Sequence, residues 1–257
     1  VSRYGPIDVL WWDWSSKDTQ GDSWRAEPLM AMVRKQQPRI IMNNRLCFSP
    51  NVEGDNLGIF DTSKGDFTTP EQHIPATGLP GVDWETCMTL NGTWGYSEHD
   101  FKWKSAETLV RNTVDIASKG GNYLINAGPL ADGTVPEAIQ VRFRELGAWM
   151  KENHEAIYGT TASPFKKLDW GRCTQKQTRS ATTLYLHVFD WPLDGRLVVP
   201  GLRNKVASAS VLGRRGKLKT VSDAGNLVVM LPATAPDPIA TTVVLRIKGA
   251  PEITEGR

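Results

Sequence analysis

The chain has 257 residues, 40% of them hydrophobic, and a formal net charge of +2. This length allows one large domain or a medium domain with a small one, and the apolar content is sufficient for buried cores. Acidic and basic residues are interleaved without a basic stripe, and no stretch approaches the roughly 20 apolar residues of a spanning helix, so neither nucleic acid nor a membrane is an expected partner.

The first half of the chain alternates short apolar runs with amphipathic stretches. Strands are predicted at residues 7–12, 39–43 and 123–126, and helices at residues 24–36, 105–117 and 136–151. Strands that alternate with helices indicate an α/β domain with a parallel sheet, and we expect it to be barrel-like.

Local signals mark the two later helices. Ser105 can cap the second helix, and Pro136 stands where the third can begin. In the third helix Ile139, Phe143, Leu146 and Met150 repeat at helical spacing, which predicts an apolar face packed on a sheet.

Between the second and third predicted strands lies a long stretch, residues 47–95, that is rich in Gly, Pro and Asp. It is predicted to be a loop. Loops of that length inside a compact domain usually serve function.

After about residue 158 the pattern changes to short strands separated by Gly, Asp and Pro turns. Strands are predicted at residues 182–190, 196–199, 206–212, 217–221, 226–231 and 241–248. This spacing is typical of a small antiparallel β-sandwich. We therefore expect an α/β domain at residues 1–160 and an all-β domain at residues 161–257.

Asp13 follows the first apolar strand directly. Functional side chains of parallel α/β domains cluster where strands end and loops begin. Trp11, Trp12 and Trp14 flank Asp13, and we expect them to surround its carboxylate with low-dielectric bulk, as suits a catalytic nucleophile. The alternative is an Asp that caps a loop or helix.

A nucleophilic carboxylate needs a second carboxyl group that donates a proton to the leaving oxygen. Glu71 and Glu85, both in the long predicted loop, are the best candidates because each adjoins a turn or an aromatic residue. Taken singly, each could be a solvated surface acid. Arg45, just past the second strand, could bind a hydroxyl group or the nucleophile, or could be an exposed surface arginine.

The three cysteines, Cys47, Cys87 and Cys173, lack metal-type spacing and are predicted to be small buried side chains. No cluster of His, Cys or carboxylates has ligand spacing. We expect neither a metal nor a cofactor, since a two-carboxylate mechanism needs no ion.

Several motifs together resemble glycoside hydrolase family 29. In chain order they are Tyr4-Gly-Pro-Ile-Asp-Val-Leu-Trp-Trp-Asp13, Asn43-Asn44-Arg45, Thr69-Pro70-Glu71, Trp84-Glu85-Thr86-Cys87-Met88-Thr89 with Trp94-Gly95-Tyr96, and Ser118-Lys-Gly-Gly-Asn-Tyr-Leu-Ile-Asn-Ala-Gly128-Pro. The match spans roughly the first 160 residues. The resemblance implies an exo-acting, retaining α-L-fucosidase with a (β/α)8-like barrel and a C-terminal β-sandwich, acting on fucosylated carbohydrate.

The resemblance also implies roles for individual residues. Asp13 matches the nucleophile. Glu71 matches the acid/base of many bacterial members, whereas Glu85 matches the glutamate given that role in animal members, and we choose Glu71 because its Thr-Pro-Glu context is intact. The positions that match residues lining the fucose pocket are Trp11, Arg45, Glu85 and Trp94.

Complete family members have an N-terminal part of the barrel with fucose-binding residues, which this sequence does not contain. A partial barrel leaves parallel edges unpaired, so we expect a homo-oligomer or a complementary N-terminal chain. A fucose-binding or assembly module without catalysis, and a retaining glycosidase for a related sugar, are the alternatives. By analogy with the family, the compartment would be secreted, periplasmic or lysosomal.

Overall fold

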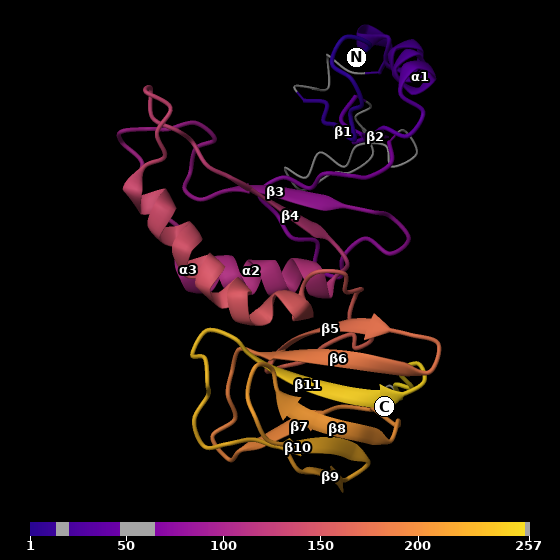
Figure 1. Ribbon diagram of the computed structural model, residues 1–257, viewed down its shortest axis with the longest axis vertical. Coiled ribbons are helices and arrows are strands. Elements are labelled where there is room, and N and C mark those ends of the chain that lie inside the picture. The colour runs from indigo at the N-terminus through magenta and orange to yellow at the C-terminus, as the bar shows by residue number, and fades with distance from the viewer. Residues whose placement is uncertain (14–20, 47–64, 255–257) are drawn as a thin grey trace. The chain divides into compact units, whose positions relative to one another are not determined.

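The protein is described by a computed structural model that covers residues 1–13, 21–46 and 65–254 (Figure 1). These residues form two compact units. Unit 1 comprises Val1–Thr89 with Gly121–Asn126, and unit 2 comprises Leu90–Gly120 with Ala127–Arg257. The compact units do not correspond to the expected domains, and the domain boundary near residue 160 stays a prediction.

Unit 1 contains an array of parallel strand segments. β1 (Val9–Leu10) pairs with β2 (Ile41–Met42), and β3 (Glu85–Thr89) pairs with β4 (Asn122–Asn126). Residues 67–71 join the two pairs through parallel bridges, which are Asn43 to Phe67, Thr68 to Trp84 and Glu71 to Cys87. The spatial order is therefore β1, β2, residues 67–71, β3 and β4, with the C-terminal ends of all segments at one edge.

Helix α1 (Ala26–Gln36) covers β1 and β2. Val33 of this helix is buried with Ile40 and Met42, and partly buried apolar residues from the β1 region, Leu10 and Trp12 among them, pack against this cluster. The helix predicted at residues 24–36 is confirmed, but it begins two residues later because Gly21–Trp24 form a 3-10 turn, η1. Cys47 and Trp14 lie outside the described residues.

The long loop predicted at residues 47–95 is wrong in part, because it contains β3. That strand has the sequence Glu-Thr-Cys-Met-Thr and buries its last four residues, so it lacks the alternation by which half-exposed strands are recognised. Its polar side chains have partners: the Thr86 hydroxyl donates to the carbonyl of His73 at 2.6 Å, and the Thr89 hydroxyl accepts from the Gln72 amide at 2.9 Å. These hydrogen bonds make burial of a threonine-rich strand tolerable.

Unit 2 begins with two packed helices, α2 (Ala106–Ser118) and α3 (Glu137–Asn153). The predicted cap is confirmed, since the Ser105 hydroxyl accepts from the Thr108 N–H at 3.1 Å. The predicted apolar face of α3 is partly wrong: Phe143 is exposed, whereas Trp149 is buried and donates its indole N–H to the carbonyl of Ala240 at 2.9 Å. Its hydrogen bond lets this large side chain take the buried place.

Two antiparallel sheets form the rest of unit 2 (Figure 1). The first has the order β5 (Gly171–Gln177), β6 (Ala181–Val188), β11 (Thr241–Lys248) and β8 (Val206–Val211), and the second has the order β7 (Arg196–Val199), β10 (Asn226–Met230) and β9 (Thr220–Asp223). Sequence patterns missed β5, a polar edge strand, and placed β9 three residues too early.

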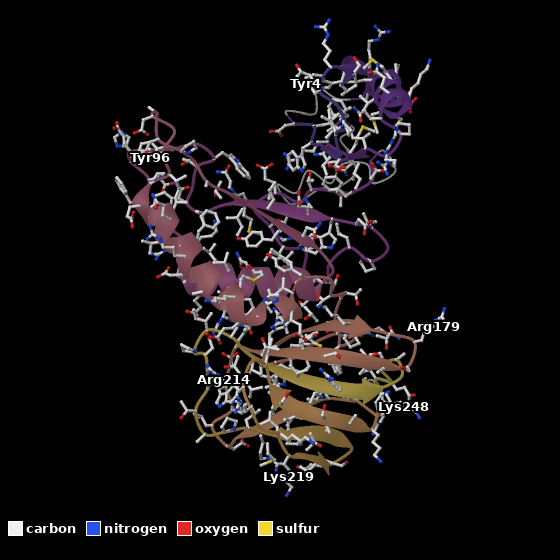
Figure 2. All side chains as sticks on the ribbon, viewed as in Figure 1. Tyr4, Tyr96, Arg179, Arg214, Lys219 and Lys248 are labelled. Carbon is white, nitrogen blue, oxygen red and sulfur yellow. The ribbon has the colours of Figure 1, made fainter. Side chains whose placement is uncertain are left out.

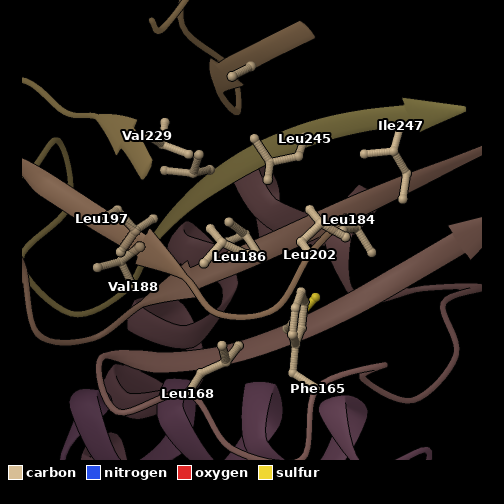
Figure 3. Packing of buried hydrophobic residues seen from close by; sticks show 14 residues of the cluster. Phe165, Leu168, Leu184, Leu186, Val188, Leu197, Leu202, Val229, Leu245 and Ile247 are labelled. Carbon is tan, nitrogen blue, oxygen red and sulfur yellow. The ribbon is translucent and has the colours of Figure 1, made fainter. Parts of the chain in front are cut away.

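The two sheets share one hydrophobic core (Figure 3). Leu184, Leu186 and Leu245 come from the first sheet, and Leu197 and Val229 from the second, and all are essentially inaccessible to solvent. Each such side chain contributes about 1.5–3 kcal/mol through burial. Charged side chains such as Arg179, Lys219 and Lys248 project outward from the strands and turns (Figure 2), so the two sheets have an apolar inside and a charged outside.

A buried polar cluster joins the end of α3 to the first sheet. His187 is fully buried between two threonines, with the Thr174 hydroxyl 3.0 Å from Nε2 and the Thr242 hydroxyl 3.2 Å from Nδ1. Thr174 also donates to the carbonyl of Ala156, and Thr242 to the side chain of Asn153. Burial is the main cause that lowers the pKa of His187 to about 3, so the imidazole is neutral at neutral pH.

The neutral state of His187 makes stability depend on pH. A folded-state pKa below the unfolded value means that the unfolded chain binds the extra proton, so stability is lost as pH falls from about 6.5 toward 3, by up to roughly 5 kcal/mol. Urea unfolding at pH 7 and pH 4.5 measures the loss. We expect His187→Gln to flatten this dependence and His99→Gln, whose imidazole is 86% exposed, to preserve it. Equal slopes in the two variants would contradict the prediction.

Candidate active site

Arg45 contacts two of the predicted site carboxylates at once. It stands just past the end of β2, and its side chain is only 7% exposed. Nη1 lies 3.0 Å from Oδ1 of Asp13, and Nη2 lies 2.8 Å from Oε2 of Glu71. Carboxylates bound to the two ends of one guanidinium group lie within a few ångströms of each other, because the group is small and planar. Because its side chain is buried, the alternative prediction that Arg45 is an exposed surface residue is wrong.

Other groups hold the guanidinium of Arg45 in place. Nε donates to the hydroxyl of Thr69 at 2.7 Å, and Nη2 lies 3.3 Å from both the carbonyl of Thr69 and Sγ of Cys87. The ring of Trp11 lies below the guanidinium, 4.3 Å from Cζ to the ring centroid. Arg45 is thus fixed on several sides before any ligand is present.

Thr69 and Cys87 are site residues that sequence reasoning missed. Thr69 stands two residues before Glu71 in the motif used to find that glutamate, so its position was the available signal. Cys87 was interpreted as a small buried side chain, and it is buried. Burial is the first cause that raises the pKa of the Cys87 thiol to about 11, against the opposing effect of Arg45. It is therefore a neutral thiol at neutral pH, unsuited to act as a nucleophile.

Glu85 opens β3 and has a different environment from Glu71. Its Oε1 accepts a hydrogen bond from the indole N–H of Trp11 at 3.3 Å. Burial raises the pKa of Glu85, while the hydrogen bond from Trp11 acts in the opposite direction. This carboxyl group therefore keeps its proton to higher pH than an exposed glutamate does.

Asp13 is less enclosed than its aromatic neighbours suggested. Its side chain is 58% exposed, so the expectation that tryptophans surround its carboxylate is wrong for the described residues. The ion pair with Arg45 orients it instead. Trp94, the remaining predicted site residue, belongs to unit 2 and is 40% exposed.

With residues 14–20, 47–64 and 255–257 left aside, no three His, Cys, Asp or Glu side chains gather as a metal site would require. Among the described residues no helix is both long and apolar enough to cross a membrane.

Comparison with known proteins identifies the family. The family model described as alpha-L-fucosidase matches residues 1–155, more than half of the chain. The chain belongs to the α-L-fucosidase family. The matched α-L-fucosidase region contains every predicted site residue, Asp13, Glu71, Trp11, Arg45, Glu85 and Trp94.

Curated α-L-fucosidases align with much of the chain. The enzyme of Dictyostelium discoideum is 30% identical over 156 residues, which are 60% of this chain and 34% of that protein. The tissue α-L-fucosidase of Bos taurus is 28% identical over 260 residues, which cover 96% of this chain and 52% of that protein. The chain therefore spans about a third to a half of the length of these relatives.

Solved structures of α-L-fucosidases share the fold. Isoenzyme 1 from Paenibacillus thiaminolyticus has a TM-score of 0.83 and 35% identity, with coverage of 95% of this chain and 58% of that one. A family 29 enzyme from Bacteroides thetaiotaomicron has a TM-score of 0.79 and 25% identity, with coverage of 96% and 58%. The latter is described as a trapped covalent intermediate, obtained with 2-fluoro-fucosyl fluoride and a glutamate-to-glutamine mutant.

Proposed function

We propose that this chain carries the catalytic carboxylates of a retaining exo-α-L-fucosidase, which hydrolyses terminal α-L-fucose from glycans or glycoconjugates. The main support for the proposal is that the guanidinium group of Arg45 contacts the carboxylates of both Asp13 and Glu71. Two carboxyl groups about 5–9.5 Å apart are the machinery of most glycoside hydrolases, and the shorter end of this range belongs to retaining enzymes.

The proposed mechanism is double displacement. Asp13 attacks the anomeric carbon of fucose while Glu71 protonates the departing glycosidic oxygen, and a covalent fucosyl-enzyme forms. Glu71 then removes a proton from water, which attacks the same carbon and releases Asp13. The covalent intermediate trapped in the Bacteroides relative supports this course of reaction.

Glu85 is the alternative acid/base, and its environment favours it in one respect. A general acid must hold a proton at the working pH, and burial raises the pKa of Glu85. Glu71 remains our assignment because it shares Arg45 with Asp13. We assign Trp11, Arg45, Glu85 and Trp94 to fucose binding, with the apolar indole faces suited to the apolar faces of the sugar.

We also propose that the parallel array of unit 1 is part of a (β/α)8-like barrel and that the two antiparallel sheets form the β-sandwich that follows it. Val9 and Ile41 are paired across β1 and β2 and are 50% and 46% exposed. Apolar side chains at paired strand positions are normally covered. A homo-oligomer or a complementary N-terminal chain would cover them, and the native mass of active material distinguishes these two arrangements.

A panel of aryl glycosides tests the proposed function. Release of the aryl group from the α-L-fucoside, but not from the α- or β-galactoside, is the expected result. Equilibrium binding of fucose with no turnover at high protein concentration would support the alternative of a binding module. Preference for another glycoside would support a glycosidase for a related sugar.

Replacing Arg45 with lysine tests how the two carboxylates are held. Lysine keeps the positive charge but cannot span two carboxylates with a planar fork, so we expect kcat/KM for an aryl fucoside to fall about 100-fold. Because Asp13 and Glu71 are partly hydrated, the loss of stability should be modest.

Arg34→Lys is the matched control for Arg45→Lys. Arg34 also pairs with a carboxylate within unit 1, and its Nη2 donates to both oxygens of Asp66. Both side chains are 37% exposed. Asp66 also accepts a hydrogen bond from the N–H of Met42 in β2, so the pair stabilises that strand. We expect the control to lower the melting temperature and to leave kcat/KM within about threefold of wild type. Equal losses of kcat/KM in both variants would contradict a specific role for Arg45.

A further inference from the structure

The side chain of Asn43 is hydrogen-bonded to the backbone that carries Asp13. Its Oδ1 accepts from the N–H of Trp12 at 2.9 Å, and its Nδ2 donates to the carbonyl of Trp12 at 3.0 Å. Asn43 is fully buried. The side-chain amide of Asn43 therefore satisfies both backbone polar groups of Trp12.

These two hydrogen bonds act on consecutive peptide groups. The N–H of Trp12 belongs to the peptide that joins it to Trp11, and its carbonyl belongs to the peptide that joins it to Asp13. The ladder between β1 and β2 ends at Leu10 and Met42, so Asn43 continues the connection by one further step, with a side chain in place of backbone. Peptide planes held in this way set the direction in which the side chain of Asp13 leaves the chain.

Asn43 is itself held from the opposite side. Its backbone forms a parallel bridge with Phe67. A Cβ atom at Gly65 would lie 2.7 Å from both the carbonyl carbon of Asn43 and the nitrogen of Asn44, closer than carbon atoms approach, so glycine permits the tight contact. The backbone of Asn43 is thus held tightly, which fixes the position from which its side-chain amide reaches Trp12.

We propose that Asn43 is a positioning residue, which holds Asp13 at the anomeric carbon by fixing the two peptides around Trp12. The proposal rests on the role of Asp13 as nucleophile. The side chain of Asp13 is 58% exposed, so packing around that side chain does not fix its direction. Displacement of a reacting group by about 1 Å costs on the order of 100-fold in rate.

A double-mutant cycle tests the proposal in a protein preparation that hydrolyses an aryl α-L-fucoside. We expect Asn43→Ala to lower kcat for an aryl α-L-fucoside about 100-fold and to leave KM within about threefold, because ground-state binding is not its target. In an Asp13→Gly background, with azide as the external nucleophile, the further change Asn43→Ala should cost less than about threefold, because the group that Asn43 positions is gone.

Asn44→Ala is the matched control. Asn44 is 2% exposed, and its amide donates to the hydroxyl of Thr68 at 3.0 Å, so its loss removes the same atoms from an equally buried place. We expect both alanine variants to lower the melting temperature, and only Asn43→Ala to lower kcat strongly. Equal losses of kcat, or an undiminished effect of Asn43→Ala in the Asp13→Gly background, would overturn the proposal and assign Asn43 a structural role.

Amide hydrogen exchange at Trp12 gives a second readout that does not depend on turnover. We expect exchange of this N–H to accelerate in Asn43→Ala and to stay slow in Asn44→Ala. Unchanged exchange of the Trp12 N–H in Asn43→Ala would mean that Asn43 does not hold this peptide group. If Asp13→Gly keeps its turnover without azide, the nucleophile assignment fails and the proposal fails with it. If Asp13→Gly is inactive and only the Asn43 results are negative, the proposal alone fails.

Discussion

Asp13→Gly is expected to reduce turnover of an aryl α-L-fucoside by about 10⁴- to 10⁶-fold, the scale on which a nucleophile contributes to hydrolases with covalent intermediates. The fold should survive, because the side chain of Asp13 is 58% exposed and its removal leaves no cavity in a core. Initial rates and thermal unfolding on the same preparation measure the two effects separately.

The stereochemistry of azide rescue identifies the role of Asp13. Glycine leaves room for azide on the face that the carboxylate occupied, so azide attacks the anomeric carbon as the aryl group leaves. A single displacement inverts configuration, and the expected product is β-fucosyl azide. Asp8→Asn, an exposed acid on the approach to the same strand, is the control and should keep wild-type turnover. Full activity of Asp13→Gly would show that Asp13 is not the nucleophile.

Glu71→Gln is expected to lower kcat/KM by about 10²- to 10⁴-fold for substrates with poor leaving groups, the usual contribution of a general acid or base. The loss should shrink as the leaving group improves, because a good leaving group departs without a proton. Azide should attack the covalent intermediate that Asp13 forms, and two inversions give α-fucosyl azide with retained configuration. Leaving-group dependence and product anomer, followed by NMR, measure both effects.

Glu85→Gln discriminates between the two candidate acids. The amide keeps an oxygen that accepts from the indole N–H of Trp11, so we expect a raised KM and no dependence on the leaving group. If this variant instead shows the leaving-group dependence and yields the retained azide, Glu85 is the acid/base and our choice of Glu71 is wrong. In that case the alkaline limb of the pH–rate profile would report the pKa of Glu85, which burial raises.

Positions near strand ends were the most predictable part of the candidate site. Asp13 and Arg45 were predicted as site residues because each follows an apolar run, and in the structure Nη1 of Arg45 lies 3.0 Å from Oδ1 of Asp13. Thr69 and Cys87 were not found, since a hydroxyl and a thiol next to a motif carry no signal of their own. Their contribution depends on residues from three strand segments meeting at one guanidinium.

Regular elements were predictable where burial alternates with exposure. The helices follow such patterns, and the cap at Ser105 depends only on residues within one turn. The strands β6 and β11 each bury five consecutive residues, and they were predictable because they are rich in the β-branched and aromatic residues that favour strands. β3 was missed because its sequence, Glu-Thr-Cys-Met-Thr, neither alternates nor forms an apolar run, and β5 because its polar residues form an edge. Phe143 was assigned to the buried face of α3 although Trp149 takes that place.

Local features could be predicted from the sequence: the order of the motifs, the helices with the cap at Ser105, the apolar strands, and the acids and arginine near their ends. Which of these residues meet depends on contacts between distant segments of the folded chain. Parallel pairing joins segments distant in the chain, and its register depends on packing across the whole array. That register brings Asp13, Arg45 and Glu71 together and buries Arg45 over the ring of Trp11. It also gives Glu71 and Glu85 different environments, because Glu71 pairs with Arg45 whereas burial raises the pKa of Glu85.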